Sequence, residues 1–176
     1  MPFTPFHWGP SSALGISLRQ LFDLPTLLVA CVIVDIEPFC VLTFGLPYPL
    51  HGFFHSFLGA SLAGVAVALA MNSFKKPLRL LSAPFKLAQE SSFLKILGTS
   101  LFGVYSHVLL DAPLYHDIRP FYPLEQNPFY QLFKPQIVYR FCALSFGVAL
   151  LAYVIRLMMP KKATNQAPTK DASREG

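Results

Sequence analysis

Long apolar runs, rather than alternating apolar and polar positions, dominate the chain. Three runs, at residues 50–71, 93–113 and 136–159, are long enough to cross the hydrocarbon core of a bilayer as helices. A fourth run begins near residue 25 and then meets two acids and Pro38, which removes a backbone donor and should break or kink that helix. The pattern predicts an all-α integral membrane protein, a bundle of four to five helices.

The N-terminal segment is shorter and more interrupted than these runs. A proline and two serines at 10–12 suit a first helical turn, but polar residues and a proline at 19–25 end it within about a dozen residues. A helix this short and this interrupted is not expected to lie only on the surface of the bundle. We therefore expect residues 10–37 to form a helical hairpin with its tip near residues 19–23.

Composition agrees with a membrane protein. Of the 176 residues, 53% are hydrophobic and only 13% are charged, whereas a soluble domain carries about 25% charged residues. The last sixteen residues differ, because they are polar and contain few apolar side chains. We expect a membrane-embedded domain over residues 1–160 and a disordered polar tail on the cytoplasmic side over residues 161–176.

The net charge of +5 is concentrated in two clusters. One occupies the expected loop 72–92 and its surroundings, and the other lies in the tail; they contain Lys75, Lys76, Arg79, Lys86 and Lys95, and Lys161, Lys162, Lys170 and Arg174. The positive-inside rule explains both clusters as cytoplasmic, which puts residues 45–55 and 107–135 on the outer side of an inner membrane. No basic face with interleaved aromatics is present, so we expect no direct nucleic-acid partner. The three cysteines sit in apolar runs and indicate inert small hydrophobes.

Ionisable side chains within the apolar runs are the candidates for function. His107 and Asp111 are four residues apart, so a helix places them on one face one turn apart. Asp35 and Glu37 flank the break in the second helix, where an intramembrane carboxylate costs about 3 kcal/mol. Two histidines four residues apart, His51 and His55, fall in the first turns of the 50–71 run, and His7 can join them through the hairpin.

These side chains form a nitrogen and oxygen ligand set without a thiolate. The set suits zinc, with manganese or iron as alternatives, better than magnesium or calcium. Two helical pairs can supply four ligands, and the acids near residue 35 can complete a two-metal cluster able to activate water on a phosphoester. His116 and Asp117 lie beside this set in the sequence, but we expect them to be loop residues rather than ligands.

Four motifs carry a family resemblance over roughly residues 1–125. The start MPFTPFHWG, VDIEP in the second helix, HGFFHS at 51–56 and SHVLLD at 106–111 resemble the YdjM/YbcI-type family of membrane-bound, metal-dependent hydrolases. The resemblance implies a metal set of His7, Asp35, Glu37, His51, His55, His107 and Asp111. Two departures stand out: the acidic motif has a valine and a glutamate where the family has a proline and an aspartate, and Gly52 and Phe54 replace a basic residue and a threonine.

The expected function is therefore metal-dependent hydrolysis of a phosphoester or lipid-like substrate, with membrane lipids as surroundings. Either Asp35 or Glu37 would act as the catalytic general base instead of a ligand. Two alternatives remain open. A transporter of ions, protons or metals also uses buried histidines and carboxylates, and a non-catalytic membrane adaptor would dock through the tail. The substrate, the metal and the oligomeric state do not follow from the sequence.

Overall fold

The computed structural model describes residues 4–159, and the expected tail at 161–176 lies outside the described residues. This part of the chain is helical and contains no strand. Its α-helices are α1 (Trp8–Ser17), α2 (Leu24–Ile33), α3 (Ile36–Phe44), α4 (Phe57–Ser82), α5 (Phe93–Asp111) and α6 (Pro135–Met158), with short 3-10 turns η1 (Thr4–His7) and η2 (Phe53–His55). The all-α expectation is confirmed. Residues 4–159 contain six α-helices instead of four to five, because the break near Pro38 separates α2 from α3.

In the described part of the chain, three helices, α4, α5 and α6, are long and apolar enough to span a membrane, and the bent pair α2 and α3 can make a fourth span. Large apolar side chains stay exposed along them, as on the outer face of α6, where Leu144 is 73% exposed. Exposed apolar surface of this kind is expected to face lipid.

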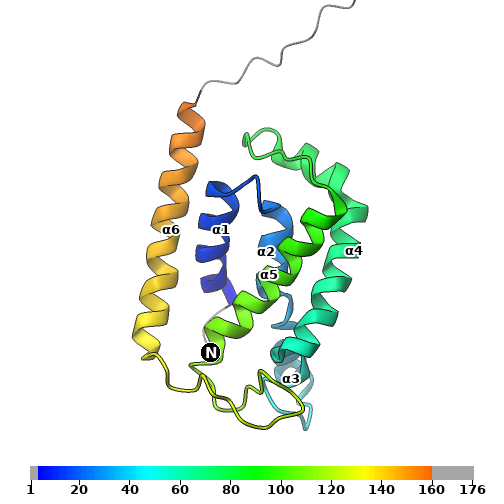
Figure 1. The fold of residues 1–176 in the computed structure, drawn as a ribbon, viewed down its shortest axis with the longest axis vertical. Coiled ribbons are helices and arrows are strands. Elements are labelled where there is room, and N and C mark those ends of the chain that lie inside the picture. Colours follow the sequence, from blue (N-terminus) through cyan, green and yellow to red (C-terminus); the bar gives the residue numbers. More distant parts are fainter. Residues whose placement is uncertain (1–3, 160–176) are drawn as a thin grey trace, which may run out of the picture.

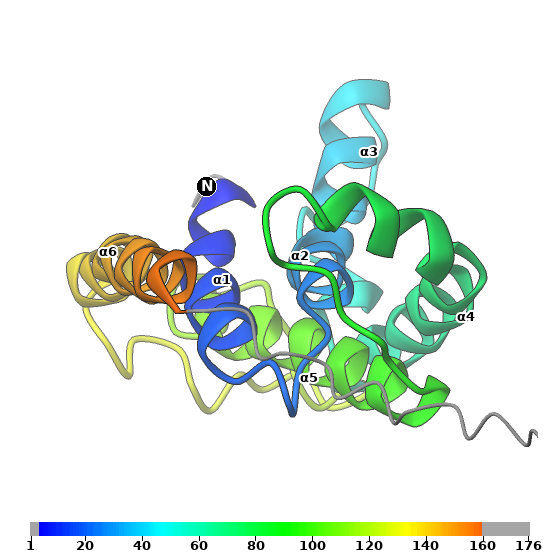
Figure 2. The ribbon, with the colours of Figure 1, turned by 90° about the horizontal axis from the view of Figure 1, so that it is seen from above.

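The helices form one bundle in which α5 crosses α2 and packs along α4, while α1 lies between α2 and α6 (Figures 1 and 2). Helices α1 and α2 run antiparallel, as the hairpin hypothesis requires, and the turn between them lies at the same end as the C-terminus of α4 (Figure 1). Asp23 caps α2 by accepting hydrogen bonds from the amide and hydroxyl of Thr26, at 3.1 and 2.6 Å.

The break between α2 and α3 has a local cause. Pro38 has no amide hydrogen and crowds the carbonyl of Val34, four residues earlier. That carbonyl instead accepts from the amide of Glu37 at 3.2 Å, a tighter turn, and the chain bends by 42° between the two helices. The bend places Asp35 at the junction, beside α5.

Two predicted boundaries are wrong. The helix expected from residue 50 begins only at Phe57, because extended Ser56 acts as its N-cap and accepts a hydrogen bond from the amide of Gly59 at 3.0 Å. His51 and His55 therefore lie in a loop and in η2. The same helix continues to Ser82, through the region expected to be a basic loop, because lysine, leucine and arginine favour helix.

Candidate metal centre

Four ionisable residues meet at the end of the bundle opposite to the basic segment. Asp35 comes from the α2–α3 junction, His55 from η2, and His107 and Asp111 from the last turns of α5. One ligand atom from each lies within 4.8 Å of all the others. These residues are up to 76 positions apart in the chain, so the fold alone brings them together.

The separations within this cluster fit a single ion. His107 Nε2 lies 3.3 Å from Asp35 Oδ1 and 3.4 Å from Asp111 Oδ2, and His55 Nε2 lies 3.7 Å from the same Asp35 oxygen. Four ligands about 2.0–2.1 Å from a tetrahedral ion lie about 3.3–3.4 Å from one another. Two of these separations match the tetrahedral value, and the other donor atoms lie within 4.8 Å of one another, so small side-chain shifts would let the four residues share an ion.

In both histidines, a hydrogen bond fixes Nδ1 so that Nε2 faces the cluster. His107 Nδ1 donates to the carbonyl oxygen of Cys31 at 2.7 Å, and His55 Nδ1 donates to Glu37 Oε2 at 3.1 Å. Both partners are acceptors only, so each Nδ1 carries a hydrogen and each Nε2 is the atom that faces the cluster. Within the described residues, both Nε2 atoms are buried and have no hydrogen-bond partner.

A buried polar nitrogen without a hydrogen-bond partner is costly. Two such nitrogens directed toward two carboxylates, with their other ring nitrogens held by hydrogen bonds, are an arrangement typical of metal ligands. The cluster of Asp35, His55, His107 and Asp111 could thus hold a metal ion. Its side chains are 0–3% exposed apart from Asp35, at 18%, so access to the cluster is beside Asp35.

His7 borders this cluster, as the hairpin hypothesis predicted. Its ring stacks on that of His107, with centroids 3.9 Å apart, and its Nε2 lies 3.2 Å from Asp111 Oδ1. The side chain is buried, and its Nδ1 has no hydrogen-bond partner among the described residues. His7 therefore contacts two members of the cluster, His107 and Asp111, but it is not one of the four residues whose donor atoms all lie close together.

The sequence predicted Glu37 as a metal ligand, but Glu37 contacts His55 and is not one of the four clustered residues. Its carboxylate accepts hydrogen bonds from the amides of Gly52 and Phe54, at 2.9 and 3.2 Å, besides the bond from His55. A side chain on Gly52 would collide with this carboxylate, since a Cβ there would lie 2.6 Å from Glu37 Oε1. Glycine at position 52, a departure from the family pattern, thus permits the contact that orients His55.

Replacing Glu37 with glutamine tests this orienting contact. The amide keeps the shape but puts an NH2 group where donors now point, so we expect the protein to fold and its metal affinity to fall about 10- to 100-fold. Isothermal titration with zinc measures the change. Glu125→Gln, at an exposed ion pair with Arg119, is the control and should leave affinity unchanged. Equal affinities in both variants would contradict the orienting role.

His51 and Asp117 form a second pair beside the cluster. His51 Nδ1 lies 3.0 Å from Asp117 Oδ1, and the amide of His51 also donates to this carboxylate, at 3.1 Å. Burial lowers the pKa of His51, and nearby His55 lowers it further, so the ring is neutral and donates. Burial alone would raise the pKa of Asp117, but the interactions with His51 outweigh it and hold that pKa below its usual range.

The sequence did not predict all the residues that surround the His51 and Asp117 pair. The ring of His51 packs edge-to-face on that of His55, with centroids 4.8 Å apart, and its centroid lies 4.2 Å from that of the Tyr115 ring. Burial and then the charge of Asp111 raise the pKa of Tyr115, which keeps its hydroxyl protonated. His116, by contrast, is exposed, as expected of a loop residue.

Sequence reasoning missed two contributors to the site. Asp117 was expected to be a loop residue without a role, because its partner is 66 positions away and no spacing signals the contact. The carbonyl of Cys31 is main chain and carries no residue-type signal. This bond requires α5 to approach α2 closely, and that approach does have a sequence signal. Position 103, in an apolar helix, is a glycine, and a Cβ there would lie 2.6 Å from Ala30 Cβ.

Fold and site together define a helical membrane protein with a histidine and aspartate cluster able to hold a metal. The sequence profile of the YdjM inner membrane protein family matches residues 7–165, so the chain belongs to that family. The match covers all the described candidate residues and agrees with the resemblance in the motifs. No curated protein and no solved structure matches the chain.

Proposed function

We propose that the protein is a membrane-bound, metal-dependent hydrolase of phosphoesters with a lipid-like substrate. The observation that carries the proposal is the pair of fixed, buried Nε2 atoms of His55 and His107, which face Asp35 and Asp111. Asp35, His55, His107 and Asp111 would hold the ion, zinc being the first choice for two nitrogens and two oxygens, with manganese or iron as alternatives. When bound, such an ion lowers the pKa of water and polarises a phosphoryl oxygen.

The remaining residues fit roles in binding and proton transfer. Glu37 already accepts three hydrogen bonds and holds His55 in place, and Asp35 is assigned to the ion, so neither acid is well placed to act as the general base. His51 resembles a base held by an acid, because Asp117 fixes its Nδ1 and leaves Nε2 to exchange a proton with substrate.

Two apolar hollows flank α2 and support a lipid-like substrate. One, of about 680 Å³, lies between α2 and α4 and is closed at the site end by Phe53 and Phe54, which directly precede His55. The other, of about 500 Å³, lies on the α6 side of α2 and includes Trp8, which follows His7. Acyl chains placed in these hollows would put a headgroup near the cluster.

The side of the membrane is part of the proposal. The site and the basic residues of α4 lie at opposite ends of the bundle (Figure 1). By the positive-inside rule the basic end is cytoplasmic, which puts the cluster on the outer side of the inner membrane.

Hydrolysis of a lipid phosphoester and of a soluble phosphoester by purified protein in vesicles, over a panel of zinc, manganese and iron, tests the function. We expect turnover with at least one metal and loss of turnover on chelation. Metal flux across the vesicles without hydrolysis would overturn the proposal in favour of a transporter. An adaptor would show neither activity and would lose its partner when residues 161–176 are removed.

Asp117→Asn tests the proton-transfer role of His51. The amide can present an NH2 group to Nδ1 and so favour the wrong tautomer, and we expect hydrolysis to slow about 10²- to 10⁴-fold. Metal content should stay unchanged, because Asp117 contacts His51 and lies outside the four-residue cluster. His116→Gln, at the neighbouring exposed position, is the control. Loss of metal from Asp117→Asn, or full activity, would contradict the role.

A further inference from the structure

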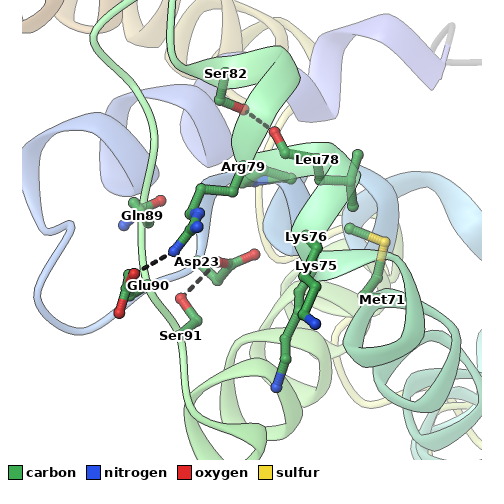
Figure 3. A pocket seen from close by; sticks show the side chains of 11 residues that line it. Asp23, Met71, Lys75, Lys76, Leu78, Arg79, Ser82, Gln89, Glu90 and Ser91 are labelled. Carbon is green, nitrogen blue, oxygen red and sulfur yellow. Dashed lines mark hydrogen bonds and ion pairs between the residues drawn. The ribbon is translucent and has the colours of Figure 1, made fainter.

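A polar pocket lies at the other end of the bundle from the metal centre. It has a volume of about 240 Å³ and is enclosed by the C-terminal part of α4 and the segment that leads into α5 (Figure 3). The α4 side contributes Lys75, Lys76 and Arg79, and the facing segment contributes Gln89, Glu90 and Ser91. Nothing in the hydrolase chemistry uses this pocket.

The wall formed by residues 89–91 is fixed by hydrogen bonds rather than left loose. Gln89 Nε2 donates to the carbonyls of Arg19 and Phe22, both at 2.9 Å, and its Oε1 accepts from the amide of Leu24. Ser91 Oγ donates to Asp23 at 2.6 Å. The pocket is thus held open between the α1–α2 turn and α4.

The charges in the pocket favour an anion. Within the described residues, the ammonium group of Lys76 has no hydrogen-bond or ion-pair partner, and Lys75 donates only to Asn72, at 3.1 Å. Arg79 reaches across to Glu90, as Figure 3 shows. The other carboxylate, Asp23, is already bonded to Thr26 and Ser91. Three cationic groups therefore face two carboxylates, which leaves the pocket with an excess of positive charge.

The position of the pocket across the membrane indicates which kind of anion reaches it. Lys75 follows the first residue of α4, Phe57, by 18 positions, which is about 27 Å along a helix axis. The hydrocarbon core is about 30 Å thick, so these lysines reach its far boundary, where lipid phosphates lie. Exposed Phe74, Leu80 and Leu81 flank them and suit acyl chains.

We propose that this pocket binds the phosphate of an anionic membrane lipid, through Lys75, Lys76 and Arg79. The lipid would tie the end of α4 to residues 89–91 at the cytoplasmic boundary. The proposal does not depend on hydrolysis, because the pocket and the metal centre are at opposite ends of the bundle and share no residue.

Native mass spectrometry of the detergent-solubilised protein, titrated with phosphatidylglycerol or phosphatidylcholine, tests this binding. We expect phosphatidylglycerol to bind preferentially and Lys75→Gln/Lys76→Gln to weaken it about 30-fold, or about 2 kcal/mol at 1.4 kcal/mol per tenfold. Glu90→Gln should tighten it several-fold, because Arg79 then becomes available to the phosphate. The control Lys134→Gln, an exposed lysine at the other end of the bundle, should change nothing.

Equal binding of the two lipids, or equal losses in the double variant and in Lys134→Gln, would overturn the proposal. A second arm separates lipid phosphate from free phosphate. Inorganic phosphate in excess should not displace phosphatidylglycerol, because it lacks the acyl chains. Complete displacement would show that the pocket takes a soluble anion and would overturn a lipid site. All variants are on exposed surface, so failure to fold is not expected.

Discussion

His107→Asn should lose the metal while keeping the fold. Asparagine can still donate to the carbonyl of Cys31, but it has no counterpart of the Nε2 atom that faces Asp35 and Asp111. Losing a direct ligand should cost more than losing an orienting contact, so we expect metal affinity to fall by more than about 100-fold. Hydrolysis should fall to background. Competition with a chromophoric chelator measures the affinity.

The control for this variant is His116→Asn, the same exchange at an exposed histidine of the same end. It should bind metal like the wild type. Circular dichroism and size-exclusion profiles of both variants establish the fold, because the buried site at 107 should lose about 1–3 kcal/mol of stability. A folded His107→Asn protein with wild-type metal affinity would contradict the ligand assignment.

Gly103→Ala should damage both stability and metal binding from a position that touches no metal. The added Cβ would lie 2.6 Å from Ala30 Cβ, so α5 must move away from α2. Overpacking of this kind costs about 1–3 kcal/mol. The same displacement stretches the bond from His107 to the Cys31 carbonyl and misplaces the ligand. Thermal unfolding in detergent and metal titration measure the two effects.

Gly98→Ala on the same helix separates this clash from any general effect of removing a glycine. Nothing lies within 4 Å of a Cβ at position 98, so this exchange should be neutral or stabilise the helix by up to about 1 kcal/mol. Adding Ala30→Gly to Gly103→Ala removes the atom that is struck and should restore part of the loss. Equal behaviour of the two alanine variants would refute the close-approach argument.

The sequence predicts the parts of this structure that follow from local patterns. Apolar length predicted the spans α5 and α6, and Pro38 predicted the break that places Asp35. The spacing of His107 and Asp111 predicted that they share a helix face. The cost of ionisable groups in apolar runs predicted a larger set. Asp35, His55, His107 and Asp111 form the four-residue cluster, whereas the other predicted members, His7, Glu37 and His51, only border it.

The rest depends on contacts that spacing does not encode. The pair His51 and His55 looks helical in sequence, but Ser56 caps the following helix and turns the two rings toward different acids. Glu37 looks equivalent to Asp35, yet the amides of a distant loop saturate it. Main-chain acceptors such as the Cys31 carbonyl have no residue identity, so only the folded chain reveals how His107 is held.

Elemental analysis of the protein purified from membranes, without chelator and without added metal, tests the central claim most directly. If Asp35, His55, His107 and Asp111 hold an ion, the wild type should retain about one transition-metal ion per chain, which strong chelation removes. A preparation that is folded by circular dichroism, contains less than about a tenth of an ion per chain and takes up none on titration with zinc, manganese or iron would contradict the account.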